Sequence, residues 1–264
     1  LTPSAPVASA DPACGGTKTY TFTYTDCAGK TYNWVYTYTI REPVVTLPAP
    51  GASTVDCLTE AVAPTPPTVT DNCNNTLTPS APVASANPAC GGTKTYTFTY
   101  SDCAGKTYNW VYTYTIREPV VTLPAPGAST VDCLTEAVAP TPPTVTDNCN
   151  NTLTPSAPVA SADPACGGTK TYTFTYTDCA GKTYNWVYTY TIREPVVTLP
   201  APGASTVDCL AEAVAPTPPV VTDNCNNTLT PSAPVASADP TCGGTKTYTF
   251  TYTDCAGKTY NWVY

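Results

Sequence analysis

Threonine and aromatic residues alternate along residues 19–40, "TYTFTYTDCAGKTYNWVYTYTI", with one interruption at Asp26-Cys27-Ala28-Gly29-Lys30. A strict period of two is typical of half-buried strands, and the Ala28-Gly29 step predicts a hairpin turn between them. Because side chains alternate between the faces of a strand, the even-numbered positions share one face, which we expect to be the core. These positions are Tyr20, Phe22, Tyr24, Tyr32, Trp34, Tyr36, Tyr38 and Ile40. The threonines at odd positions are expected on the opposite face.

Residues 43–118 contain further short strand signals separated by proline and glycine. Strands are predicted in "PVVTLPAP" (43–50) and "ASTVDC" (52–57), and in the first part of "LTEAVAPTPPTVTDNC" (58–73), whose remainder is a proline-rich loop. "LTPSAPVAS" (77–85) is predicted to be an edge strand because its prolines cannot donate to a ladder. No helical period is present. Many short strands with frequent turn signals predict an all-β sandwich.

The chain is an internal repeat. "LTPSAPVASADPAC" begins at Leu1 and returns, nearly unchanged, at Leu77, Leu153 and Leu229, so the period is 76 residues. The boundary between repeats is placed at Arg41-Glu42-Pro43, where the β-rich segment ends. This boundary predicts domains at 1–42, 43–118, 119–194 and 195–264. The copies differ at few positions, such as Asp11/Asn87, Thr25/Ser101, Thr59/Ala211, Thr68/Val220 and Ala13/Thr241, and we expect these on loops or solvent faces. Copies this similar leave little room for one specialised catalytic centre, so the protein is not expected to be an enzyme.

The composition excludes several classes of partner. The net charge is −8, with 11 Lys and Arg residues and no His, so the cationic surface that phosphate binding requires is absent and nucleic acid is not an expected partner. No run of about 18 apolar residues is present, so no transmembrane helix is expected. The sequence has no signal peptide or initiator Met and begins within a repeat, so we expect a mature stretch or a portion of a longer protein.

Fourteen cysteines are evenly placed, and none forms a CxxC pair. Without CxxC or His a zinc site is not expected, whereas regular cysteines in a β-rich chain indicate disulfides and a secreted, extracellular protein. Four cysteines per repeat allow three pairings. The sequential pairing is rejected because Cys90 and Cys103 bracket one extended strand about 30 Å long, while a disulfide needs Cα atoms within about 7 Å.

Of the two remaining pairings, we favour the one that joins cysteines at the same pole of a sandwich. The loop of Cys73 and the turn of Cys103 can meet at one pole, and Cys57 and Cys90 at the other. The predicted bonds are Cys57–Cys90, Cys73–Cys103, Cys133–Cys166, Cys149–Cys179, Cys209–Cys242 and Cys225–Cys255. Cys14 and Cys27 would then lack partners because the front half of their repeat lies outside the sequence.

"PPTVTDNCNNT", followed by "YTFTYTDCAGKTY" and "VYTYTI", resembles the hyalin-repeat (HYR)-like domain in its four-cysteine form, which occurs in secreted and cell-surface proteins of the Bacteroidota. The resemblance covers nearly the whole chain. It implies tandem immunoglobulin-like β-sandwiches in a cell-surface or extracellular array of structural or adhesive function. It implies no catalytic residues. The near-identical copies and the density of Thr and Pro depart from the general pattern and favour a building material.

Several residue sets have a second interpretation. The carboxylates Asp26, Asp56, Glu60 and Asp71 are a candidate Ca²⁺ site, although they form no ligand-dense loop and solvated turn carboxylates are the favoured interpretation; nothing groups them into a glycosidase pair. No other cofactor is expected. The aromatic face could stack sugars but is better explained as a core. The threonine face could bind ice but is better explained as an ordinary strand exterior.

"NNT" makes a glycosylation sequon of Asn74, Asn150 and Asn226, each beside a loop cysteine. Abundant Ser, Thr and Pro offer O-linked positions as well, so we expect covalent glycans. Together these observations predict a structural component of an extracellular filament or stalk, whose partners are neighbouring repeats or copies of the same chain. The alternative is an adhesin or carbohydrate-binding array that gains avidity from repetition.

Overall fold

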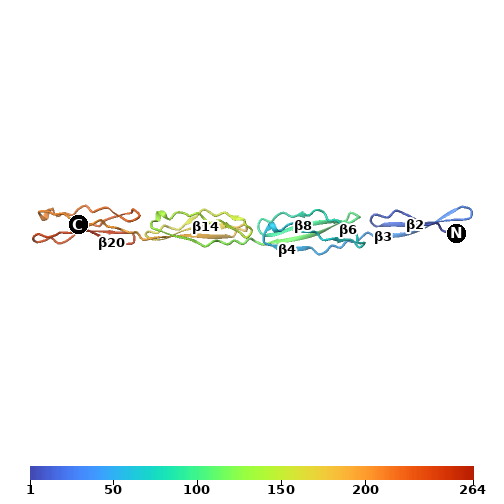
Figure 1. Ribbon diagram of the computed structural model, residues 1–264, viewed down its shortest axis with the longest axis horizontal. Helices are drawn as coiled ribbons and strands as arrows, with labels where there is room; N and C mark the ends of the chain where they lie inside the picture. Colours follow the sequence, from blue (N-terminus) through green and yellow to red (C-terminus); the bar gives the residue numbers. More distant parts are fainter. The chain divides into compact units, whose positions relative to one another are not determined.

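The computed structural model describes residues 1–264 and divides them into two compact units, Leu1–Val120 and Val121–Tyr264. The first unit contains the back half of one repeat and a complete repeat, and the second contains a complete repeat and most of another. In Figure 1 the repeats can be followed by their colours, from blue at the N-terminus to red at the C-terminus. The protein is all-β apart from three single turns of 3-10 helix, as the alternation predicted. The helices span three residues each, too few to cross a bilayer.

The strands of the first unit fall into two groups. Residues 1–42 contribute a three-stranded sheet in the order β1-β2-β3, and residues 43–118 contribute a four-stranded sheet in the order β4-β9-β8-β7 and the two-stranded β5-β6. The elements are β1 (Val7–Ala8), β2 (Gly16–Thr25), β3 (Thr31–Ile40), β4 (Gly51–Val55), η1 (Leu58–Glu60), β5 (Val69–Thr70), β6 (Thr76–Leu77), β7 (Val83–Ala84), β8 (Gly92–Ser101) and β9 (Thr107–Ile116).

The second unit repeats this plan. Its sheets have the orders β10-β15-β14-β13, β11-β12, β16-β17 and β18-β19-β20. The elements are β10 (Gly127–Val131), η2 (Leu134–Glu136), β11 (Val145–Thr146), β12 (Thr152–Leu153), β13 (Val159–Ala160), β14 (Gly168–Thr177), β15 (Thr183–Ile192), η3 (Leu210–Glu212), β16 (Val221–Thr222), β17 (Thr228–Leu229), β18 (Val235–Ala236), β19 (Tyr248–Thr253) and β20 (Thr259–Val263).

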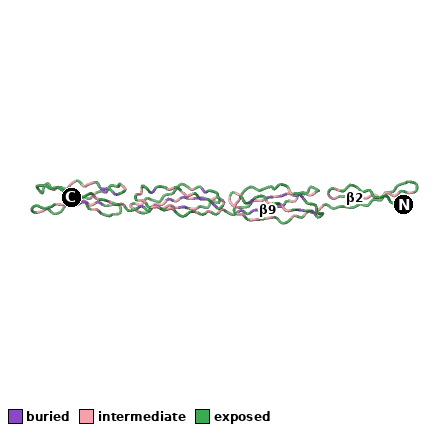
Figure 2. The backbone as a smooth tube through the Cα atoms, in the orientation of Figure 1, coloured by how far each residue is buried: buried purple, intermediate pink, exposed green.

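In the repeat at residues 43–118 the long hairpin buries the aromatic residues as predicted. Phe98 pairs with Trp110 and Tyr100 with Tyr108 across β8 and β9, so both sets of rings lie on one face. Phe98, Tyr100 and Trp110 are 2%, 0% and 7% exposed, and buried positions alternate with more exposed ones along the strands (Figure 2). The polar atoms of the rings are satisfied inside the core. The hydroxyl of Tyr100 donates to the carbonyl of Pro67 at 2.6 Å, and the indole N–H of Trp110 donates to the carbonyl of Ala49 at 2.9 Å.

In the first copy the prediction of a buried aromatic face is wrong for β3, because residues 1–42 contribute only the back half of a repeat and no strands cover this face. The residues of β3 that were expected in the core are 40–53% exposed: Tyr32, Trp34, Tyr36, Tyr38 and Ile40.

The positions that differ between copies lie at the surface, as expected, and residues 11, 25, 59, 68 and 13 with their counterparts are all exposed. One exchange alters an ion pair. Lys170 pairs with Asp163 at 2.6 Å, and Lys18 pairs with Asp11, whereas Asn87 stands at the equivalent position of the second copy. Exposed pairs of this kind contribute about 0–1 kcal/mol, which explains why the exchange is tolerated.

Two strand predictions need correction. "LTE" (58–60) forms a turn of 3-10 helix instead of continuing a strand, because the Glu60 carboxylate accepts the N–H groups of Asp56 and Cys57 and turns the chain. Residues 43–50 form only an isolated bridge, Val45 to Asp71. "LTPSAPVAS" does contain an edge strand, β7, but its prolines divide it into β6, the Pro79–Tyr100 bridge and β7.

The first and last strands of a complete repeat lie side by side and parallel. Gly127 of β10 pairs with Tyr188 of β15, and the ladder continues to Val131 and Ile192. Glycine is required at residue 127 because an added Cβ would overlap the ring of Tyr188. This contact brings the N-terminal strand onto the aromatic hairpin and closes the sandwich.

Gly127→Ala is expected to loosen the β10–β15 pair, since overpacking a closely packed site costs about 1–3 kcal/mol. Hydrogen exchange measured by mass spectrometry tests this. The peptide that carries the substitution should exchange faster than the otherwise identical peptide around Gly51 in the same sample. Both peptides are taken through the residue equivalent to Thr59, where Ala211 distinguishes the copy around Gly203. Ala128→Ser, at the exposed neighbouring position, is the matched control and should leave its peptide exchanging like the Gly51 peptide. Equal protection of the substituted peptide and the Gly51 peptide would contradict the close contact.

The four tryptophans are expected to differ in reactivity. Trp34 is 53% exposed, whereas Trp110, Trp186 and Trp262 are each 7% exposed. N-bromosuccinimide should therefore oxidise one tryptophan per chain rapidly, and Trp34→Phe should abolish that fast phase without accelerating the rest. Fast oxidation of two or more residues in the native chain would show that the aromatic face is not the core.

Candidate functional site: the joint between repeats

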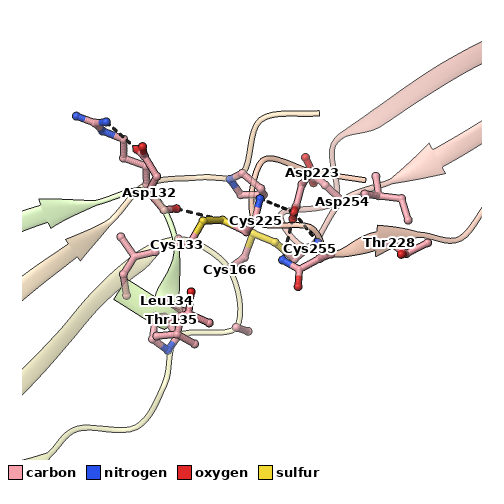
Figure 3. A pocket seen from close by; sticks show the side chains of 18 of the residues that line it. Asp132, Cys133, Leu134, Thr135, Cys166, Asp223, Cys225, Thr228, Asp254 and Cys255 are labelled. Carbon is pink, nitrogen blue, oxygen red and sulfur yellow. Dashed lines mark hydrogen bonds and ion pairs between the residues drawn. A yellow bond between two sulfur atoms is a disulfide. The ribbon is translucent and has the colours of Figure 1, made fainter. Parts of the chain in front are cut away.

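Two disulfides connect consecutive repeats in the second unit. Cys133 bonds Cys225, and Cys166 bonds Cys255, with Cα–Cα distances of 5.6 and 5.3 Å. The four residues, which we call the joint, line a single pocket of about 680 Å³ together with Asp223 and Asp254 (Figure 3). The first unit contains an equivalent bond between repeats, Cys14–Cys103, so the expectation that Cys14 lacks a partner is wrong. Each of these bonds leaves one repeat and ends in the next.

The predicted pairings Cys133–Cys166, Cys225–Cys255, Cys209–Cys242 and Cys73–Cys103 are therefore wrong. The predicted poles are correct, because Cys133 and Cys166 lie together, as do Cys225 and Cys255. The thiols of one pole, however, face those of the neighbouring repeat and bond across the joint. Cys57, Cys90, Cys149 and Cys179 are also disulfide-bonded. For them, Cys57–Cys90 and Cys149–Cys179 stay predictions.

Two related turns present the cysteines of the following repeat. In each, an aspartate side chain accepts the backbone N–H groups two and four residues later: Asp223 accepts from Cys225 and Asn227 at 2.8 Å, and Asp254 from Ala256 and Lys258 at 3.0 and 2.8 Å. The residue three positions after each aspartate has a left-handed conformation. It is Asn226 in one turn (φ 66°) and Gly257 in the other (φ 81°), the residue types that adopt this conformation most readily.

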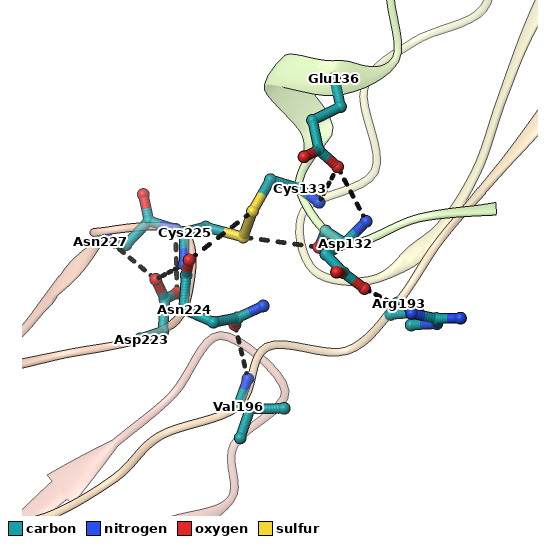
Figure 4. Close-up of a disulfide and its surroundings, with 9 residues drawn as sticks. All are labelled: Asp132, Cys133, Glu136, Arg193, Val196, Asp223, Asn224, Cys225 and Asn227. Atoms are coloured by element: carbon teal, nitrogen blue, oxygen red, sulfur yellow. Dashed lines mark hydrogen bonds and ion pairs between the residues drawn. A yellow bond between two sulfur atoms is a disulfide. The ribbon is translucent and has the colours of Figure 1, made fainter.

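The cysteines of the preceding repeat are held by their own local contacts. The Glu136 carboxylate accepts the N–H groups of Asp132 and Cys133 at 3.0 and 3.2 Å (Figure 4). Arg193 pairs with Asp132 at 2.7 Å, and Asn224 accepts the N–H of Val196 at 2.8 Å, so the segment that connects the repeats is tied to the turn on each side of it. The Sγ of Cys225 lies 3.5 Å from the carbonyl oxygen of Asp132. Both sides of the bond are thus ordered by contacts of their own.

The disulfides close long loops. Cys133–Cys225 spans 92 residues and Cys166–Cys255 spans 89. On the chain-entropy account, each loop of this size removes about 4–5 kcal/mol of entropy from the unfolded state. The Arg193–Asp132 pair, with side chains 65% and 54% exposed, contributes far less. The disulfides therefore dominate the strength of the joint.

Four cysteines are free and exposed: Cys27, Cys73, Cys209 and Cys242. Two of them have the same local backbone contacts or conformation as a bonded copy. Cys209 has φ −125° and ψ 144°, against −126° and 146° for Cys133. Cys73 donates its N–H to Asp71 at 2.8 Å, as Cys225 does to Asp223. The backbone at Cys209 and at Cys73 is therefore arranged in the same way as at their bonded counterparts.

The four candidate Ca²⁺ ligands serve the backbone or an ion pair instead of converging. Asp26 accepts N–H groups of its own turn, Asp56 pairs with Arg117 at 2.7 Å, and Glu60 and Asp71 accept backbone N–H groups. No group of three or more His, Cys, Asp or Glu side chains is placed to hold a metal ion. The sequon residues Asn74, Asn150 and Asn226 are exposed and have φ values of 64°, 63° and 66°.

The aspartates of the first turn type are buried. Burial alone would raise the pKa of Asp223, but the side-chain N–H of Asn227 and the backbone N–H groups of Asn227 and Cys225 outweigh it and lower the pKa below its usual range. The pKa of Asp147 is lowered by the same balance. The charged carboxylate therefore stabilises the turn that carries Cys225.

Asp223→Asn is expected to lower the thermal midpoint at pH 7, because hydrogen bonds to a charged group contribute about 1.5–3 kcal/mol. A lowered folded pKa means that this contribution is fully present above the unfolded value of about 3.9 and is lost as pH falls through the folded pKa. The gap between wild type and variant should therefore narrow at pH 2–3. Asp239→Asn, which removes only an exposed partner of Lys246, is the control. If the thermal midpoints of wild type and Asp223→Asn differed by the same amount at both pH values, the charged Asp223 carboxylate would not be what stabilises the turn.

The chain was compared with known protein families, curated proteins and solved structures. A search of curated proteins finds no match. Among solved structures, the chain is similar to the extracellular cadherin domains 1–4 of protocadherin gamma B7, at 11% identity and a TM-score of 0.32, covering 95% of this chain and 82% of that one. It is also similar to the human desmocollin-1 ectodomain, at 8% identity and a TM-score of 0.23, covering 94% and 64%.

A family model described as the HYR-like domain with 4 cysteines matches residues 1–40, 45–116, 121–192 and 197–264. These four matches include nearly every residue, and each lies within one copy of the repeat. They agree with the resemblance that "TDNC" and "TDCAGKT" carry in the sequence. The chain therefore belongs to the family of HYR-like domains with four cysteines.

Proposed function

We propose that this tandem array is a structural component of an extracellular filament or stalk. The observation that carries the proposal is the joint, where two disulfides bond consecutive repeats in series. A disulfide within one domain stabilises that domain, whereas bonds between repeats stabilise the connection from one repeat to the next. Disulfides of this number also support a secreted location, because they persist in oxidising compartments. A bacterial source among the Bacteroidota is part of the proposal.

The strand arrangement supports a role under tension. β10 and β15 are the first and last strands of residues 119–194, and they run parallel over five paired residues. When the two ends of the repeat are pulled apart, their hydrogen bonds are strained together, in shear. Arg193 extends the ladder by donating its N–H to Val131 at 3.0 Å. Such a pair resists separation better than one whose bonds open singly.

Exposed polar positions support the expectation of covalent glycans. Asn74, Asn150 and Asn226 occupy left-handed positions on turns, where their side chains are accessible. The alternative of a carbohydrate-binding adhesin has less support, because in the complete repeats the rings that could stack on sugars are in the core: Tyr100 and Tyr176 are both 0% exposed. A glycan array probed with the oxidised chain separates the two functions. Specific binding would favour the adhesin.

Antibodies against the 264-residue chain are expected to label extracellular threads of the source organism along their length in negative-stain images. Native material should also exceed the polypeptide mass, and Asn→Gln changes at residues 74, 150 and 226 should remove the N-linked part of the excess. Labelling of discrete particles, or of the cell interior, would exclude the filament. A bare polypeptide mass would exclude the glycans and leave the filament standing.

A further inference from the structure

The two disulfides of the joint form overlapping closed loops. One loop runs from Cys133 to Cys225 and the other from Cys166 to Cys255, so residues 166–225 belong to both. A tension applied to the two ends of this unit can follow covalent bonds without passing through the segment inside a loop. The connectivity alone therefore determines how much of the chain can be stretched.

The covalent path through either disulfide is short. From Val120 to Cys133 and from Cys225 to Tyr264 it contains about 52 residues, or roughly 180 Å when fully extended. Through Cys166–Cys255 it contains about 55 residues, or roughly 190 Å. The same segment without disulfides contains about 144 residues and extends to roughly 490 Å. The two paths differ by only about three residues, although the bonds leave the chain at different places.

We propose that the two disulfides of the joint set an upper limit on the extension of residues 120–264 under tension, and that either one alone is sufficient to set it. The biological role of this limit rests on the proposed filament function: in a filament under tension, the disulfides of the joint would prevent overextension. The β10–β15 ladder and the core open first, and the bonds then stop further extension at roughly a third of the free contour. The closed segments stay slack, so they can refold while the unit is still under tension.

Release from the limit requires reduction of both bonds. In each reduction a small dithiol gives two electrons and two protons to the disulfide, which becomes two cysteine thiols, while the dithiol closes to a cyclic disulfide. The first reduction moves the tension to the remaining bond at almost the same length. Only the second releases the segment, so the array tolerates loss of either bond at a joint.

Optical-tweezers pulling on the full chain tests the proposal, with one handle at the exposed Val120 through an azide-bearing residue and the other at the C-terminus. The oxidised wild type should stop at roughly 180 Å, and the double variants Cys133→Ser/Cys225→Ser and Cys166→Ser/Cys255→Ser should both stop at no more than roughly 190 Å.

The variant that carries all four changes is the positive control for release. Cys149 and Cys179 are also bonded, and their bonds can shorten its free path by about 30 residues at most, so it should reach at least roughly 390 Å. A double variant that extends as far as the fourfold variant, or a wild type that does, would overturn the proposal.

A second measurement avoids any folding defect of the variants. Wild-type chain held at constant high force in dithiothreitol should show its main lengthening, at least roughly twofold, only after both bonds of the joint are reduced. Reduction of the first of them should give a small step at most. If each of the two reductions lengthened the chain by a similar amount, the proposal that either bond alone limits the extension would be contradicted. The proposed filament and this limit can fail separately, because the pulling experiment uses single chains and the labelling experiment uses native threads.

Discussion

The covalent bond between Cys133 and Cys225 depends on two short turns that belong to different repeats. Each turn is fixed by one carboxylate: Glu136 holds the N–H groups on one side, and Asp223 holds them on the other. Apart from the bond, these turns meet through long contacts of sulfur with carbonyl oxygens, 3.5 Å from Cys225 to Asp132 and 4.0 Å from Cys133 to Asn224. Such contacts are weak. The serial arrangement thus depends on chemistry at a few surface atoms.

The interior of each repeat follows a different principle. A repeat of this size buries a limited area, and the structure compensates with large rings placed directly opposite one another, such as Phe98 against Trp110. Tyr100 is fully enclosed and still satisfies its hydroxyl on Pro67. Rings with one polar atom combine high buried area with a fixed orientation. Rings therefore make up more than half of the core cluster of residues 119–194, and two cysteines of this repeat, Cys133 and Cys166, are used at the joint.

Much of the fold could be predicted from the sequence, because side-chain parity in a strand is a local property. Tyr96, Phe98 and Tyr100 are buried for the same reason that Thr95, Thr97 and Thr99 are more exposed. The disulfide partners could not be predicted in this way. A position at the same pole allows Cys225 and Cys255 to bond each other or to bond cysteines of the neighbouring repeat. Only the packing of two consecutive repeats decides between these two pairings. Similarly, Leu58-Thr59-Glu60 is too short for a helical period to show.

The bonds between repeats also constrain how the array can change in length over generations. The cysteines of these bonds find their partners one repeat along the chain: Cys14–Cys103 and Cys166–Cys255 both span 89 residues, and Cys133–Cys225 spans 92. Recombination between near-identical copies that gains or loses a whole 76-residue period leaves each of these sulfurs opposite a partner. A gain or loss that splits a period can remove one cysteine of a pair and leave the other without its partner. Near-identity of the copies and pairing across the joint therefore favour variation by whole periods, and a gene of this kind can lengthen or shorten its product without redesigning a single contact.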